Sequence, residues 1–244
     1  MITCTNLRKG FNGQEVLKGL SLTIESREIT VVIGRSGEGK SVFLKHLVGL
    51  MKPDSGSIEI DGRDIAKAGG AELRAIKEQF GFVFQGGALF DSLTVFENVA
   101  FPLRHKTKVG PAELKDRVGE ILEQVGLKEF GNRYPAEISG GMAKRVAVAR
   151  ALVLRPPVIL FDEPLTGLDP VISNTILDLI GQVHDLYRFT GVVVSHDIPQ
   201  IFELADQVAM LQEGTILFSG KPDDIFDCPD ERVQFFLNGG RERK

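Results

Sequence analysis

The sequence predicts an α/β fold built around a phosphate-binding loop, with a β-rich start and a helical stretch in the middle of the chain. The first observation behind this prediction is a run of β-branched and apolar residues at 29–33, which favours a buried strand. The second is the Gly-x-x-x-x-Gly-Lys-Ser pattern at 34–41, and the third is the apolar-periodic helix pattern that follows it. A strand, a glycine loop and a helix in this order form the P-loop motif.

We expect the loop to bind a nucleotide. Its glycines let backbone N–H groups close around phosphate oxygens, and the next helix points its positive end at the same place. Lys40 would reach the β- and γ-phosphates, and the Ser41 hydroxyl would bind Mg²⁺. A carboxylate facing phosphate is repelled, so the Glu38 side chain is expected to point outward. The predicted binding residues of the loop are Gly34, Arg35, Ser36, Gly37, Glu38, Gly39, Lys40 and Ser41.

Composition excludes several classes of protein. The 244 residues suffice for one domain or two closely associated lobes, and 43% hydrophobic with 25% charged residues is ordinary for a globular protein. The formal net charge of −4 argues against broad nucleic-acid binding. The sequence has no apolar run of membrane-spanning length, no signal-peptide pattern and only two distant cysteines. We therefore expect a cytoplasmic protein that reaches a membrane only through partners.

Two candidate ligand contacts lie outside the P-loop and before the helical stretch. Phe11 stands in a turn between the opening strands, where it could stack on a purine base or simply pack in the core. Gln85 follows a second buried strand at 81–84, and ligands collect at the carboxyl ends of strands in α/β sheets. A plain loop hydrogen bond is the alternative for Gln85.

Residues 86–155 are predicted to be mainly helical. One helix is expected at 111–125, with Pro near its start and Gly just after its end, and another at about 141–154. Ser139 precedes the second helix and could serve only as its N-cap. Gly140 and Gly141 exceed what a cap needs, however, and would allow a bulky anion to approach the helix N-terminus.

Polar side chains also follow two later strand-like runs. Asp162 and Glu163 end the apolar run that starts at Val158, and buried carboxylates are costly unless a cation is near. Mg²⁺ would explain Asp162, and a water that must lose a proton would explain Glu163; two surface acids are the alternative. His196 follows the run at 191–194 and is a candidate γ-phosphate or water contact, although a lone histidine is more often structural.

With these motifs in order, the chain resembles ATP-binding-cassette (ABC) ATPases over nearly its full length. The resemblance implies the following roles: Phe11 for adenine stacking, 34–41 for Walker A, Gln85 for the Q-loop, 138–142 for the signature, Asp162 and Glu163 for Walker B, Asp169 for the D-loop and His196 for the switch histidine. It implies that Glu163, His196 and Gln85 are catalytic, that Ser41, Gln85 and Asp162 bind Mg²⁺, and that Ser139, Gly140, Gly141 and Asp169 bind ATP. Ile138 and Met142 depart from the common Leu and Gln of the signature.

The resemblance also implies an architecture. A single ABC ATPase domain would span 1–240, with a P-loop NTPase core at 1–85 and 156–227, an antiparallel β-subdomain at its N-terminal end, a helical signature subdomain at 86–155 and a C-terminal tail at 228–244. Two copies would form a head-to-tail, ATP-dependent homodimer. In that dimer Ser139 of one cassette would meet the ATP held by Lys40 of the other.

Three stretches, 86–103, 138–152 and 236–239, are similar to ATPases of Mla-type lipid-trafficking ABC systems, which work with MCE proteins. This similarity implies an ATPase on the inner face of the cytoplasmic membrane, bound to a permease and an MCE-type lipid-binding protein and not to nucleic acid. Phe90, Leu93 and Phe96 would offer the permease's coupling helix an apolar groove, unless they pack the helical core. The alternatives are a small-solute importer or an envelope complex that transports nothing. A nucleic-acid or ribosome ABC protein typically needs two cassettes or a long coiled-coil insertion, and the chain has neither.

Overall fold

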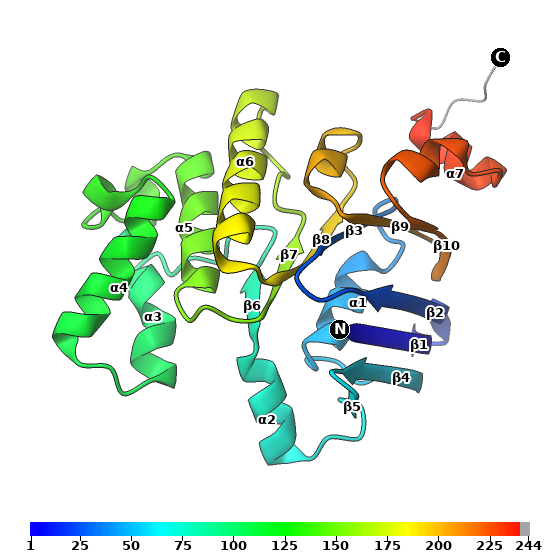
Figure 1. Ribbon diagram of the computed structural model, residues 1–244, viewed down its shortest axis with the longest axis horizontal. Coiled ribbons are helices and arrows are strands. Elements are labelled where there is room, and N and C mark those ends of the chain that lie inside the picture. Colours follow the sequence, from blue (N-terminus) through cyan, green and yellow to red (C-terminus); the bar gives the residue numbers. More distant parts are fainter. Residues whose placement is uncertain (240–244) are drawn as a thin grey trace. The chain divides into compact units, whose positions relative to one another are not determined.

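The computed structural model describes residues 1–239, which form two compact units (Figure 1). The first contains residues 1–80 and 189–239, and the second contains residues 81–188. The charged end that the sequence predicts to fray, residues 241–244, lies outside the described residues. Within residues 1–239, no helix combines the length and the apolar character that crossing a membrane requires.

The first unit begins with the antiparallel sheet that the fold prediction requires. Its strands, in sheet order, are β2 (Gln14–Ile24), β1 (Ile2–Phe11), β4 (Ser55–Ile60) and β5 (Arg63–Asp64). Asn12 and Gly13 join β1 to β2 with φ of 51° and 81°. Asp61 and Gly62 join β4 to β5 with φ of 47° and 78°. Positive φ at both central residues is what a type I′ hairpin turn needs, so the Asn-Gly and Asp-Gly pairs explain both turns.

A second sheet in the same unit carries the P-loop. Its order is β10 (Thr215–Gly220), β9 (Gln207–Gln212), β3 (Ile29–Ile33) and β8 (Thr190–Ser195). β3 is parallel to both β8 and β9, and every residue of β3 and β8 is buried, as central parallel strands usually are. Ile33 lies opposite Ser195. The chain therefore leaves β3 and β8 at the same edge of the sheet.

The helices of the first unit are short. They are α1 (Lys40–Leu47), α2 (Gly70–Glu78), α7 (Glu231–Leu237) and the 3₁₀ helices η3 (Gln200–Leu204) and η4 (Asp223–Asp227). The sequence predicts a helix at 201–205, and η3 lies there as a 3₁₀ helix. The stretch between Pro199 and the start of β9 is too short for several α-helical turns, and 3₁₀ turns are common in such connections.

The second unit is mostly helical. The sequence predicts helices for residues 86–155, whereas this unit also contains residues 156–188, which the resemblance assigns to the nucleotide-binding core. Its elements are β6 (Phe80–Val83), α3 (Val95–Lys106), α4 (Pro111–Gln124), η1 (Lys128–Phe130), η2 (Pro135–Glu137), α5 (Gly140–Leu152), β7 (Val158–Asp162) and α6 (Pro170–Tyr187). β6 and β7 are neighbours, and α5 packs against α3, α4 and α6. The apolar pattern of the sequence predicts that Met142 faces inward from α5. The structure shows Met142 half-buried and Lys144, two residues later, buried.

Local capping explains where α3 begins. Thr94 and Glu97 form a capping box, in which each side chain accepts a hydrogen bond from the other residue's backbone N–H. Asn98, one residue further, is fully buried. Its side chain accepts from the Phe90 N–H and donates to the carbonyl oxygens of Phe90, Leu93 and Thr94 at 2.8–3.1 Å. One amide therefore fixes the loop that leads into α3.

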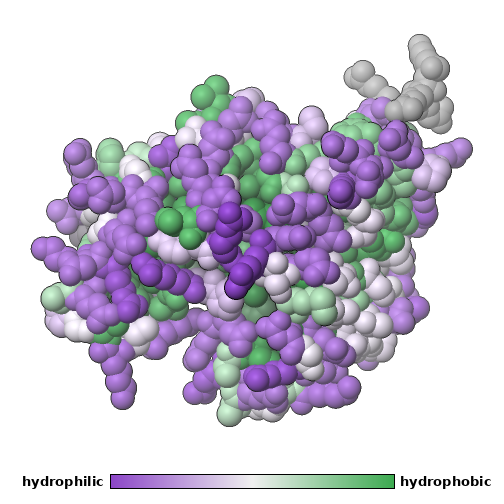
Figure 2. All heavy atoms as spheres, viewed as in Figure 1, coloured by the Kyte–Doolittle hydropathy of each residue, from purple (hydrophilic) through white to green (hydrophobic). Residues whose placement is uncertain are grey.

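Polar residues cover most of the molecular face in Figure 2, and apolar residues gather in smaller groups on it. Phe11, Phe84 and Phe90 are among the exposed large apolar side chains of the described residues. Single exposed apolar residues are normal on soluble domains.

Asn98→Ala is expected to lower the free energy of unfolding by about 2–3 kcal/mol, because it leaves buried backbone groups without partners. Urea unfolding followed by circular dichroism measures the change. Asp91→Ala, an exposed change in the same loop, is the control and should shift stability by less than about 0.5 kcal/mol. Equal effects of the two changes would show that Asn98 does not organise the loop.

Candidate functional site

The P-loop, which follows β3, has glycines at positions where a residue with a Cβ would be strained or would clash. Gly37 and Gly39 have φ of 89° and 99°, a left-handed conformation that glycine adopts at little cost. A Cβ at Gly34 would overlap the carbonyl oxygen of Leu211 in β9. Gly39, as the N-cap of α1, provides no side-chain cap, so the first N–H groups of α1 can turn to a ligand.

The Lys40 side chain extends back over the P-loop that precedes it. Its Nζ donates to the carbonyl oxygens of Gly34 at 2.6 Å and Arg35 at 3.1 Å, and the side chain is only 5% exposed. Ser41 follows it in α1 and is half-buried. The ammonium therefore lies over the loop that the glycines shape, where a phosphate chain would need a positive charge.

Two P-loop side chains contact the C-terminal part of the first unit. The Glu38 carboxylate accepts a hydrogen bond from the backbone N–H of Glu213, in the turn between β9 and β10. This contact fits the expectation that Glu38 points away from a bound phosphate. The Arg35 guanidinium lies 5.3 Å from the ring centre of Phe235 in α7, which is a cation–π distance.

His196 leaves β8 at the edge of the sheet where the P-loop leaves β3. Its Nε2 is 3.8 Å from Oδ1 of Asp197, which is too long for a hydrogen bond. The other carboxylate oxygen of Asp197 is buried without a hydrogen-bond partner among the described residues. Phe11, at the end of β1, keeps 40% of its surface exposed, with the Lys9 ammonium 5.6 Å from its ring centre. Its ring is accessible for stacking.

In the second unit, the predicted Walker B residues end β7. Asp162 and Glu163 are only 9% and 7% exposed. Glu163 has a φ of 49°, a strained value for a residue with a side chain. Strain of this kind persists where the surroundings enforce it, and it concentrates at functional sites. The Thr166 hydroxyl, just after this segment, is buried without a hydrogen-bond partner among the described residues.

The predicted signature and D-loop residues also cap helices. Ser139 caps α5 by accepting from the Met142 N–H at 3.3 Å, and Asp169 caps α6 by accepting from the Val171 and Ile172 N–H groups at 3.0 Å. A Cβ at Gly141 would lie 2.7 Å from Cγ2 of Ile172 in α6. Gly141 thus permits the contact between α5 and α6. The sequence alone did not suggest this reason for the second of the two glycines.

Gln85 follows β6 and is exposed, and its backbone oxygen accepts a hydrogen bond from the Lys144 ammonium. Lys144 is not among the residues predicted from the sequence, although its place among the apolar positions of α5 is a usable signal. Burial lowers the pKa of Lys144, whereas the charges of Asp162 and Glu163 act in the opposite direction. Gln85, Asp162, Glu163 and Lys144 therefore belong to one neighbourhood of the second unit.

The profile of the family described as "ABC transporter" matches residues 17–166, which contain the P-loop, Gln85, the signature and the residues ending β7. The chain belongs to this family. As a member it is an ATP-binding subunit that hydrolyses ATP for transport, as the motif order predicts. The α/β fold with a P-loop core is confirmed as well.

Relatives from three bacteria match most of the chain. The "Probable ribonucleotide transport ATP-binding protein mkl" of Mycobacterium tuberculosis is 42% identical over 240 residues, which are 98% of this chain and 67% of that protein. The "Intermembrane phospholipid transport system ATP-binding protein MlaF" of Haemophilus influenzae is 36% identical over 239 residues, with 98% and 90% covered. MlaF of Escherichia coli K12 is 38% identical over 224 residues, with 92% and 83% covered.

Solved structures of ABC cassettes share the fold. An ATP-binding cassette solved as a dimer in a post-hydrolysis state with ADP and Pi has a TM-score of 0.81 and 33% identity, covering 91% of this chain and 99% of that one. CbiO1 of Clostridium perfringens, part of an ABC transporter complex, has a TM-score of 0.86 and 29% identity, covering 97% and 94%.

The contact between Gly141 and α6 yields a prediction with a built-in control. Gly141→Ala should destabilise the protein by about 1–3 kcal/mol, because the added methyl group overlaps Ile172. Gly140→Ala is the matched change, since its Cβ would meet nothing closer than 4.0 Å. Thermal unfolding of both variants measures the difference. If Gly140→Ala is as destabilising as Gly141→Ala, the overlap with Ile172 is not the cause.

Proposed function

We propose that this chain powers a membrane permease that moves phospholipid between membranes. The observation that carries the proposal is the similarity to MlaF, a phospholipid-transport ATPase by name, over most of both chains. Such coverage includes the helical unit, the part of ABC ATPases that faces the permease, as well as the nucleotide-binding motifs. We further propose a head-to-tail homodimer and an MCE-type lipid-binding protein in the same complex.

A second candidate is the transport of ribonucleotides or other small solutes. The relative named for ribonucleotide transport has the higher identity, 42%, which favours this candidate. The alignment covers 67% of that relative, however, against 90% and 83% of the two MlaF proteins. Both candidates share the same ATPase chemistry and differ in the partner complex and its cargo.

For nucleotide binding, we assign the phosphates to the P-loop. The backbone N–H groups of residues 37–41 would surround the phosphate oxygens, which would replace the carbonyls of Gly34 and Arg35 as acceptors for Lys40. The exposed ring of Phe11 would stack on adenine. Ser139, Gly140, Gly141 and Asp169 would contact the ATP held by the partner cassette of the homodimer.

The residues offered to a metal suit Mg²⁺, which prefers oxygen ligands. In the first unit Ser41 presents a hydroxyl, and in the second Asp162 presents a carboxylate and Gln85 an amide oxygen. Asp162 is a buried carboxylate, and a nearby cation would offset the cost of burying its charge. A bound Mg²⁺ would neutralise part of the phosphate charge during hydrolysis.

Glu163 would accept the proton of the attacking water as the general base. Burial and its fixed left-handed backbone limit the orientations of its carboxylate. His196 would donate a hydrogen bond to the γ-phosphate, and Gln85 would help to place the water. The products would be ADP and inorganic phosphate.

Glu163→Gln should keep ATP binding and lower the hydrolysis rate by about 10²–10⁴-fold, because the amide cannot accept the proton. Steady-state phosphate release and nucleotide binding measure the two effects separately. The variant should also accumulate as an ATP-bound dimer in size-exclusion chromatography. Hydrolysis near the wild-type rate would rule out Glu163 as the base.

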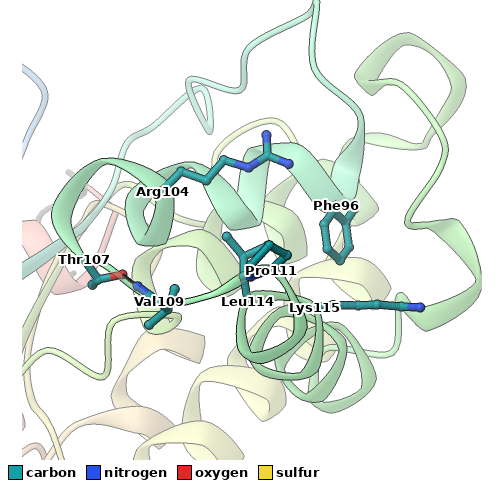
Figure 3. Close-up of a pocket in the computed structure, with 7 residues that line it drawn as sticks. All are labelled: Phe96, Arg104, Thr107, Val109, Pro111, Leu114 and Lys115. Atoms are coloured by element: carbon teal, nitrogen blue, oxygen red, sulfur yellow. Dashed lines mark hydrogen bonds between the residues drawn. The ribbon is translucent and has the colours of Figure 1, made fainter.

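The second unit offers a pocket for the permease. The pocket holds about 540 Å³ and lies between α3 and α4 (Figure 3). Its lining residues are Phe96, Arg104, Thr107, Val109, Pro111, Leu114 and Lys115. In Figure 3 Pro111 and Leu114 lie together with the Phe96 ring nearby, the Arg104 side chain runs along α3, and Lys115 extends away from them. The apolar centre of the pocket suits the apolar residues of a permease helix, and the basic residues at its rim suit an acidic residue of the same helix.

Only part of the predicted groove belongs to this pocket. Of the three aromatic and aliphatic residues expected there, Phe96 lines the pocket, whereas Phe90 and Leu93 do not. The Phe90 ring packs on Phe101 at 4.6 Å between ring centres and still keeps 42% of its surface exposed. Leu93 is half-buried in the loop that Asn98 organises.

Purification of the native complex from membranes tests the cargo. We expect the chain to be recovered with a permease and a membrane-anchored MCE-type protein, and phospholipid to be extracted from the complex.

Leu114→Asp should abolish this recovery and leave the ATPase activity of the isolated chain intact, because a charge enters the apolar centre of the pocket. Ala112→Asp, on the exposed surface of the same helix, is the control. Recovery of a permease with a soluble solute-binding protein would favour the second candidate.

A further inference from the structure

The carboxylate of Asp54 holds the end of the strand that carries Phe11. Its Oδ1 accepts a hydrogen bond from the Lys9 ammonium at 2.6 Å, and its Oδ2 accepts one from the Gly10 backbone N–H at 2.8 Å. The backbone N–H of Asp54 donates to the carbonyl oxygen of Arg8 at 2.9 Å. Three consecutive residues of β1 are therefore fixed to one residue, which directly precedes β4.

The ring of Phe11 follows this anchored segment. The Lys9 ammonium, which Asp54 holds, lies over the ring at 5.6 Å from its centre. A cation at this distance is attracted to the face of an aromatic ring. Phe11 nevertheless keeps 40% of its surface exposed. Asp54 thus holds a cation against the ring, and the ring keeps a surface that a flat base can reach.

An irregularity in the same hairpin connects it to the P-loop. The pairing of β1 with β2 shifts by one residue between Lys9 and Gly10, and Val16 of β2 is left without a partner in β1. Such bulges are common beside active sites, where they redirect side chains. A Cβ at Gly39 of the P-loop would lie only 3.0 Å from Cγ1 of Val16. The hairpin that ends in Phe11 therefore packs directly against the phosphate-binding loop.

We propose that Asp54 is a positioning residue for the base of the nucleotide, which holds Lys9 and Gly10 so that the Phe11 ring is ready to stack on adenine. Ordering a side chain when a ligand binds costs affinity, and a ring that is held beforehand avoids part of this cost. The Asp54 side chain is 54% exposed, and ion pairs at such sites add little stability. Its effect should therefore fall on nucleotide affinity more than on folding. The inference rests on the proposed stacking of Phe11.

An ion pair in the same hairpin provides a matched control. Arg8 pairs with Glu15 at 3.2 Å, and the Glu15 side chain is 52% exposed, close to the value for Asp54. Both carboxylates thus pair with a cation of β1 at the surface, but it is Asp54 that pairs with the lysine lying over the ring. Asp54→Ala and Glu15→Ala remove comparable ion pairs that differ in their relation to Phe11.

Titration calorimetry of the full chain with ADP tests the inference. We expect Asp54→Ala to weaken ADP binding by about three- to tenfold and Glu15→Ala to weaken it by less than about twofold. Phe11→Ala should weaken it by about fivefold or more, because the stacked base is lost. In the double variant, Asp54→Ala should add less than about twofold to the effect of Phe11→Ala, because the ring through which Asp54 acts is gone.

Two further measurements separate positioning from a merely structural role. Inorganic triphosphate has no base, so its affinity, measured by competition with ADP, should stay within about twofold of the wild type in Asp54→Ala. The chain contains no tryptophan, so Phe11→Trp adds a single fluorescent reporter at the stacking position. Asp54→Ala in this background should lower the fluorescence anisotropy of the nucleotide-free protein, because the ring is less restricted, whereas Glu15→Ala should not.

The inference is overturned if Asp54→Ala binds ADP as the wild type does, or if its effect is equally large in the Phe11→Ala background. An equal loss of triphosphate affinity would also overturn it, because the effect would then lie at the P-loop. Should Asp54→Ala fail to fold, Lys9→Met removes the same ion pair and is judged by the same criteria.

Phe11→Ala distinguishes this failure from failure of the proposed function. If Phe11→Ala binds ADP normally, the proposed stacking fails, and the role of Asp54 fails with it. If Phe11→Ala weakens ADP binding while Asp54→Ala does not, the stacking survives and only the role of Asp54 is lost.

Discussion

The parallel pairing of β3 with β8 and β9 is the constraint on which the nucleotide-binding part of the structure depends. It places Ile33 beside Ser195, so the P-loop and His196 leave the sheet at one edge. It also brings Leu211 of β9 so close to Gly34 that no side chain fits between them. The glycine is therefore needed for sheet packing as much as for phosphate binding. Packing against β9 therefore helps to shape the backbone of the loop.

In the second unit, hydrogen bonds from two cations of α5 hold the segment that follows β6. Lys144 and Arg150 extend from α5 to the carbonyl oxygens of residues 85–88. Lys144 is buried, and burying a charge is costly unless it has a partner. These contacts favour one arrangement of α5 and segment 85–88 over its alternatives.

Much of the fold could be predicted because local sequence determined it. Val31 and Val32 lie in a β-branched run, Asn12-Gly13 suits a type I′ turn, and Pro111 suits the first turn of a helix. The candidate motif residues could be proposed for the same reason, because the strand, the spaced glycines and the helix of a P-loop follow one another in the sequence. The roles of Gly141 and Lys144 could not be predicted in this way, because the first depends on a side chain of α6 and the second on a loop about sixty residues away. Such contacts exist only after the chain has packed.

The contacts of Glu38 with Glu213 and of Arg35 with Phe235 have a consequence for folding. They join the phosphate-binding loop to residues that lie 175 or more positions later in the sequence. Contacts between residues so far apart make folding slow, because a long stretch of chain must close into a loop before they can form. We therefore expect the P-loop to gain the support of the turn after β9 and of α7 late in the folding of the first unit.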